Sequence, residues 1–238
     1  MTRKPIVALL IGVAVFAAAV VVTDLTAGKA FGENAVILQV LMKLVFAVLS
    51  VLTALLLKLP LSVFNFFKGY KIRVTWKYAL FAALLGAIAS VLMLVLNVPP
   101  VPLVKGMPLV LMILVIWFWS SLCEEIFARG LVQGLLKDDP RSFAFPWLGS
   151  VSVGSLVSAG AFSLVHFSIF VKGGSIYTAL FIMFFTFLLG LMCGQARDRS
   201  CLGSAVIVHA AFNVGGFIGA VISNILLIII TGKLPVAG

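Results

Sequence analysis

Polar side chains that could activate water stand inside three apolar stretches of this chain. They form three short patterns: Glu-Glu-x-x-x-Arg at Glu124, Glu125 and Arg129, Phe-x-x-x-His at Phe162 and His166, and His-x-x-x-Asn at His209 and Asn213. The two histidines are the only ones in the sequence. A carboxylate with an imidazole can act as a base on water, and an imidazole with an amide can stabilise an oxyanion. Together the patterns supply the groups that a hydrolytic site requires.

The spacing within each pattern indicates which side chains share a helix face. Glu125 and Arg129 are four residues apart, which predicts an ion pair on one face. Glu124 points about 100° away and is predicted to face another neighbour, so one carboxylate is left over. The alternatives stay open: a structural ion-pair network for the glutamates, and a satisfied core side chain for His166. For His209 and Asn213 the alternative is a helix-to-helix hydrogen bond.

The elements that must position these groups are membrane helices. The chain is 63% hydrophobic and only 10% charged, with a mean hydropathy of +1.27, whereas soluble domains contain about 45–50% apolar and about 25% charged residues. The sequence predicts an all-α polytopic membrane protein that forms one bundle and a single domain over residues 1–238. Seven segments are long enough to span, with an eighth left open: Pro5–Leu25, Ala35–Leu57, Tyr78–Val98, Met107–Leu136, Leu148–Phe170, Ser175–Gln195 and Leu202–Ile230.

The motifs divide this domain into two parts. The helices of residues 1–106 carry none of them, and residues 107–231 form the predicted core. The fourth and seventh spans are longer than a bilayer requires, so each must tilt, protrude or break. Gly215-Gly216 is the predicted break in the seventh, whereas Gly130 and Gly134 could allow close packing or a bend in the fourth. In the sixth, Gly190-x-x-x-Gly194 is predicted to serve packing.

The basic residues indicate the topology. Eleven of them fall on one side of the predicted spans: Arg3, Lys4, Lys58, Lys68, Lys71, Arg73, Lys77, Lys137, Arg141, Arg197 and Arg199. Four fall on the other: Lys29, Lys105, Lys172 and Lys233. This asymmetry predicts a cytoplasmic N-terminus. The basic residues that give the net charge of +10 are therefore predicted to contact anionic lipid headgroups and not nucleic acid.

Several features outside the motifs receive their own interpretation. The Lys58–Lys77 segment, which is rich in aromatic residues, is predicted to be interfacial. Lys43 shares a face with Gln39 and could either line a polar cavity or snorkel to the surface. Cysteines 123, 193 and 201 have no metal or disulfide spacing. The first span is read as a retained anchor, with a signal peptide cleaved near residues 28–30 as the alternative.

At the three motifs the chain resembles the CPBP family of intramembrane proteases, also called the CAAX-processing and bacteriocin-processing or Abi family. That family carries the same three patterns in the same order, each on its own transmembrane helix. Supporting context includes Arg129-Gly130, Pro146-Trp147 and the stretch from Gly190 to Ser204. The resemblance extends over about Leu111–Asn213, and some members have eight spans.

The resemblance implies a mechanism. Glu124 and His166 would activate a water, His209 and Asn213 would stabilise the oxyanion, and Glu125 with Arg129 would fix the geometry, beside Phe162. Metal-independent catalysis by glutamate is favoured, and no cofactor is expected. The alternative is a zinc site formed by Glu124, His166 and His209.

The expected function is that of an intramembrane endopeptidase acting on a membrane-associated peptide or protein tail. The expected location is a prokaryotic plasma membrane. A non-catalytic immunity or scaffold protein of the same fold is the first alternative. A proton-coupled or ion-coupled transporter is the second, and the absence of an internal repeat disfavours it.

Overall fold

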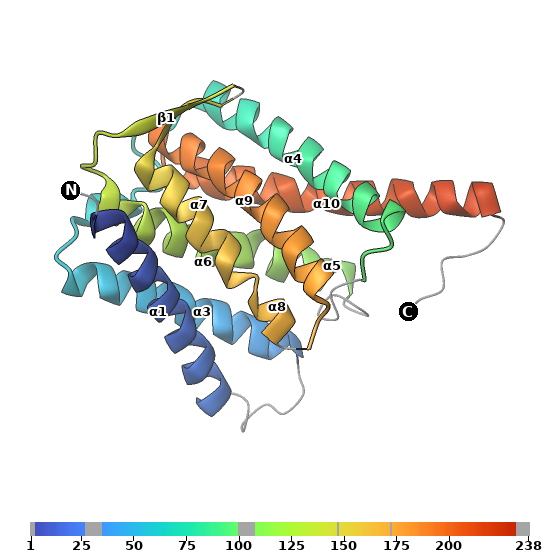
Figure 1. The fold of residues 1–238 in the computed structure, drawn as a ribbon, viewed down its shortest axis with the longest axis horizontal. Coiled ribbons are helices and arrows are strands. Elements are labelled where there is room, and N and C mark those ends of the chain that lie inside the picture. Colours follow the sequence, from blue (N-terminus) through green and yellow to red (C-terminus); the bar gives the residue numbers. More distant parts are fainter. Residues whose placement is uncertain (1–2, 27–34, 100–107, 147, 172, 232–238) are drawn as a thin grey trace.

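The structure is a computed structural model that describes residues 3–26, 35–99, 108–146, 148–171 and 173–231. Seven helices within these residues are long and apolar enough to cross a membrane, so the chain is an all-α polytopic membrane protein. Its longer helices are α1 (Arg3–Thr26), α3 (Ala35–Leu56), α4 (Ile72–Val95), α7 (Val153–Val165), α9 (Ile176–Arg199) and α10 (Leu202–Thr231). Figure 1 shows them as one bundle, with α1 and α3 on one side and α4 beside α10 on the other.

The fourth span is built from several short helical pieces. They are α5 (Leu109–Leu111), the π-helix η3 (Met112–Ser120), α6 (Ser121–Glu125), the π-helix η4 (Ile126–Val132) and the 3₁₀-helix η5 (Gly134–Leu136). A π-helix bonds residue i to i+5, so each turn holds more residues and the span is shortened. The extra length is therefore taken up by wide turns on both sides of α6, which carries Glu124 and Glu125.

The seventh span does not break at Gly215-Gly216, and that prediction is wrong. Helix α10 runs without interruption from Leu202 to Thr231. A Cβ atom at Gly215 would overlap the backbone of Ala83 on α4, and one at Gly219 would lie 2.5 Å from the carbonyl oxygen of Ala87. The glycines of α10 therefore allow two backbones to approach closely, as small residues do between membrane helices.

The glycines of the sixth span also serve packing, as the sequence predicted. A Cβ atom at Gly190 would lie 2.8 Å from Ala159, and one at Gly194 would lie 2.7 Å from the hydroxyl of Ser155. Helices α7 and α9 thus meet along a seam of small residues, and Figure 1 shows them side by side in the middle of the bundle. This seam brings the helix that precedes His166 close to the helix that carries Gly190.

The described residues of the connector between the fourth and fifth spans include a β-hairpin. Strands β1 (Ser142–Phe145) and β2 (Gly149–Ser152) pair antiparallel. The fifth span therefore begins at Val153 and not at Leu148, since β2 takes the preceding residues and the side chain of Ser152 caps the helix. The third span begins earlier than predicted, at Ile72.

Part of the Lys58–Lys77 segment folds back onto the bundle. The 3₁₀-helix η1 (Leu61–Phe64) packs against η4, where Phe64 lies against the backbone of Gly130 and Val63 lies against Gly134. Farther along the segment Phe67 is 82% exposed, and an interfacial location of these residues stays a prediction. The two glycines of the fourth span therefore serve close packing.

Some sequence predictions fall outside the described residues. They include the cleavage alternative at residues 28–30, Trp147 of the supporting context, and Met107 at the predicted start of the fourth span and of the core. Cysteines 123, 193 and 201 are buried free thiols. The first helix packs on α3 and α7 and contributes Ala8, Val15 and Ala19 to the core.

Candidate functional site

Glu125 and Arg129 form the predicted ion pair at the centre of the bundle. Both side chains are fully buried, and Nε of Arg129 lies 3.1 Å from Oε2 of Glu125. The N–H does not point along this contact, so the attraction is ionic and not a hydrogen bond. Arg129 also donates from Nη2 to the carbonyl oxygen of Gly190 at 2.7 Å. The guanidinium therefore ties the fourth span to α9 and fixes the carboxylate beside it.

His209 on α10 lies between the two glutamates. Its Nδ1 is 2.9 Å from Oε1 of Glu125, and its Nε2 is 3.5 Å from Oε2 of Glu124. The residue is 4% exposed. Since a carboxylate only accepts, Nδ1 carries the proton and donates to Glu125. Glu125 thus sets the tautomer of His209 and aims its second nitrogen at Glu124.

Glu124 is not the unpaired acid that the sequence suggested. Its Oε1 forms an ion pair with the ammonium of Lys43 on α3. The adjacent turn of α3 is anchored by Trp119, whose indole Nε1 donates to the carbonyl oxygen of Val40 at 3.1 Å. The two carboxylates of α6 are therefore each matched by one cation.

The sequence pattern does not place Lys43 in the site. Its shared face with Gln39 predicts either a polar cavity or a side chain that snorkels to the surface. A usable signal was present, because a lysine in the interior of a span requires a partner. Glu124 was the acid left without one once Glu125 had been assigned to Arg129.

His166 is placed beside the cluster by Phe162. It is the first residue after α7, and its Nδ1 lies 2.9 Å from the carbonyl oxygen of Phe162. The Phe162 ring contacts the rings of His166 and His209 edge-on, with centroids 5.1 Å and 5.3 Å away, and stacks 5.5 Å from the guanidinium of Arg129. His166 interacts electrostatically with Glu124. The three motifs therefore meet around one aromatic ring.

Asn213 lies one turn from His209 on α10, but its contacts are with the fourth span. Its amide nitrogen donates to Oγ of Ser121 at 3.1 Å and to the carbonyl oxygen of Ile116 at 3.3 Å. This matches the alternative in which the residue joins two helices. An oxyanion role would require one of these two hydrogen bonds to be exchanged for the substrate.

Whether these donors fit a zinc ion depends on their arrangement and on which of their atoms are free. Within the described residues, no group of three or more His, Cys, Asp or Glu side chains has the arrangement of a metal site. One oxygen of Glu124 is held by the ammonium of Lys43. An ammonium on a carboxylate competes directly with a divalent cation for that oxygen. The donor set as arranged does not fit a preformed three-ligand zinc site.

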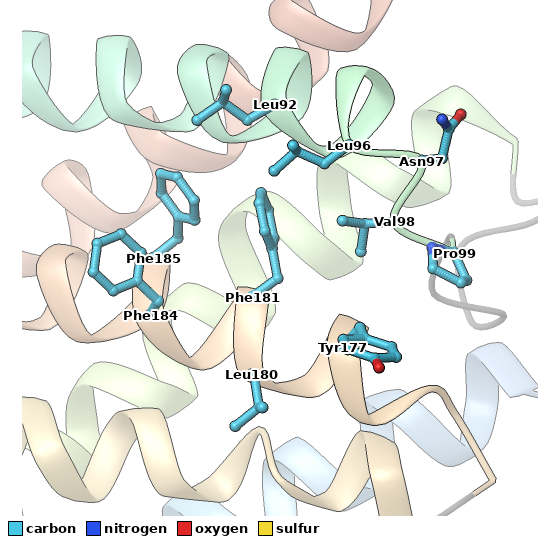
Figure 2. A pocket seen from close by; sticks show the side chains of 10 residues that line it. All are labelled: Leu92, Leu96, Asn97, Val98, Pro99, Tyr177, Leu180, Phe181, Phe184 and Phe185. Carbon is cyan, nitrogen blue, oxygen red and sulfur yellow. The ribbon is translucent and has the colours of Figure 1, made fainter.

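An apolar pocket lies away from these residues. It measures about 640 Å³ and is lined by the end of α4, the residues that follow it and the start of α9, including Leu92, Tyr177 and Phe181. Figure 2 shows that aliphatic and aromatic side chains line it, together with the amide side chain of Asn97. None of the predicted site residues lines it.

Comparison with known proteins agrees with the motifs. No match was found among the curated proteins or the solved structures. Residues 106–215 match the family model described as type II CAAX prenyl endopeptidase Rce1-like. This range contains all three motifs and excludes α1, α3 and α4. Residues 106–215 of this membrane protein are therefore similar to the Rce1-like type II CAAX prenyl endopeptidases, in agreement with the resemblance that the three motifs carry.

Proposed function

We propose that this protein is a membrane endopeptidase of the CAAX type, which hydrolyses a peptide bond in a membrane-associated peptide or protein tail. The family match supports the coarse reaction class. The observation that carries the proposal is the position of His209, whose two nitrogens face Glu125 at 2.9 Å and Glu124 at 3.5 Å. A buried imidazole oriented by one carboxylate and aimed at another is an arrangement suited to proton transfer.

In the proposed mechanism Glu124 accepts a proton from water, and His166 helps to orient that water. The resulting hydroxide attacks the carbonyl carbon of the scissile bond. His209 and Asn213 then stabilise the oxyanion, for which the ring of His209 must be protonated and Asn213 must release one of its present acceptors. The proton held by Glu124 passes to the leaving amine, which restores the carboxylate.

Glu125 and Arg129 hold this geometry without touching the substrate. Arg129 is fixed by Gly190, and Glu125 is fixed by Arg129, so the ring of His209 is oriented by a chain of buried contacts. Buried groups that are locked in this way do not reorganise during the reaction. We propose that catalysis is of the glutamic type, because Lys43 occupies the carboxylate that a metal would need.

The proposed setting follows from the distribution of charge. An N-terminus in the cytoplasm accounts for eleven basic residues on that side against four. A prokaryotic plasma membrane is the proposed location. Residues 1–238 act as one unit in this proposal, with the motif-bearing core of 107–231 completed by Lys43 from the N-terminal helices.

The test compares the peptide termini in membranes from cells that express the intact protein, Glu124→Ala or Asp24→Ala at matched levels. Asp24 is an exposed acid near the end of α1 and serves as the matched control. We expect a set of termini that is present with the intact protein and Asp24→Ala and absent with Glu124→Ala. Identical termini in all three samples would contradict the protease and favour the immunity or scaffold role.

A further inference from the structure

Lys43 lies outside the segment that matches the family, yet it touches the proposed base. It belongs to α3, and its ammonium contacts Oε1 of Glu124. Its side chain is 16% exposed and that of Glu124 is 8% exposed. An ion pair shielded from water to this degree is screened much less than one at a surface.

The position of Lys43 is fixed by contacts on both sides of it along α3. Three residues earlier, the carbonyl oxygen of Val40 accepts the hydrogen bond of Trp119 at 3.1 Å. Three residues later, the ring of Phe46 packs on that of Phe127, with centroids 4.3 Å apart. Both partners lie on the fourth span, on either side of Glu124. The turn of α3 between these contacts therefore presents Lys43 to Glu124.

The contact divides the two oxygens of Glu124 between different tasks. Oε1 is held by Lys43, whereas Oε2 faces Nε2 of His209 at 3.5 Å. A free carboxylate could rotate and exchange its oxygens. With one oxygen held by an ammonium, the other keeps a constant direction toward the histidine.

We propose that Lys43 is a positioning residue of the endopeptidase, which holds Oε1 of Glu124 so that Oε2 stays directed at His209. This inference rests on the proposed function. It also extends the working site beyond the family-matched segment, to a helix that carries none of the three motifs. Lys43 acts through Glu124 and has no assigned contact with the substrate.

The first test measures cleavage of an internally quenched, prenylated peptide with a CAAX end by the full chain in nanodiscs. Lys43→Met removes the ammonium and keeps the length of the side chain, Lys43→Arg keeps a cation, and Lys68→Met removes an exposed loop charge as a control. We expect Lys43→Met to lower kcat on the order of tenfold or more with little change in KM, since misplacement of a catalytic group costs rate. Lys43→Arg should recover most of the loss, and Lys68→Met should match the intact protein.

The second test does not depend on cleavage. The chain has two histidines, so ¹⁵N-labelled histidine gives the signals of two rings, which His166→Phe assigns. We expect Lys43→Met to shift the Nε2 signal of His209, Lys43→Arg to shift it less, and Lys68→Met to leave it unchanged. Size-exclusion chromatography checks that each variant is folded. If Lys43→Met does not fold, the Nε2 signal of His209 in Lys43→Arg still tests the inference.

The outcomes separate this inference from the function on which it rests. If the intact protein cleaves none of the peptides tested, that function is contradicted for this substrate class, while the His209 signal still decides whether Lys43 orients Glu124. If the intact protein cleaves and Lys43→Met keeps both its kcat and its His209 signal, the positioning role is overturned and the endopeptidase stands. A changed kcat with an unchanged His209 signal also overturns it.

Discussion

Nδ1 of His209 lies 2.9 Å from Oε1 of Glu125, although 84 residues separate the two along the chain. Both side chains are buried, at 5% and 0% exposure. This contact joins α10 to the fourth span at the same level as the pair of Glu125 with Arg129. The histidine and the ion pair are therefore one connected unit. A substitution in either should change the position of the other.

Glu125→Gln tests how much that unit contributes to the stability of the fold. The amide can still accept from His209, but it leaves the buried charge of Arg129 without compensation. Breaking one partner of a buried ion pair costs about 3–5 kcal/mol. We expect a marked fall in the thermal unfolding temperature of the protein in detergent. Size-exclusion chromatography after heating measures the fraction that stays folded. A variant as stable as the intact protein would mean that the buried guanidinium does not need this carboxylate.

Glu124→Gln should separate chemistry from stability. The amide cannot accept a proton from water at neutral pH, so we expect cleavage of the prenylated peptide to fall on the order of 10²–10⁴-fold. A turnover rate within a few-fold of that of the intact protein would exclude Glu124 as the base. Asp24→Asn, at the exposed end of α1, should leave the rate unchanged.

Phe162→Leu should affect turnover more than it affects substrate binding. The ring contacts both histidine rings and the Arg129 guanidinium, and each such aromatic contact contributes about 0.5–1.5 kcal/mol. We expect kcat to fall while KM is nearly constant. Phe184→Leu, which changes the separate pocket in Figure 2, is the matched control. Equal effects of both variants would indicate a general loss of packing.

Gly215→Ala tests the seam between α4 and α10. The added methyl group would overlap the backbone of Ala83, and overpacking of this kind costs about 1–3 kcal/mol or more. Gly160→Ala is the control, because a Cβ atom there meets nothing within 4 Å. It should be neutral or stabilising by about 0.5–1 kcal/mol, since alanine favours a helix. Similar unfolding temperatures for both variants would contradict the close approach.

Treatment with a chelator tests the glutamic type of catalysis. Because Lys43 holds one oxygen of Glu124, we expect the rate of peptide cleavage to survive incubation with a zinc chelator and removal of that chelator. Inactivation that added zinc reverses would show that a metal takes part. If a metal does take part, Lys43→Met should bind zinc more tightly than the intact protein, because the variant no longer has an ammonium on Glu124. Isothermal titration measures this affinity.

The local patterns of the sequence determined much of this protein. The seven membrane helices follow from apolar runs that are long enough to span. The pairing of Glu125 with Arg129 follows from their spacing on one helix, and the seam at Gly190 and Gly194 follows from small residues at helical spacing. Each of these features depends on residues within one helix or along one helix face. The periodicity of the sequence indicates such features directly.

Tertiary structure decided what depends on the choice of neighbour. The pairing of Lys43 with Glu124 requires α3 to pack on the fourth span. The unbroken α10 requires α4 to lie against its glycines, and the π-turns around α6 depend on how a long span is accommodated in the bundle. Which helices meet, and in which register, is set by the packing of many side chains at once. The spacing of residues along a single helix does not contain that information.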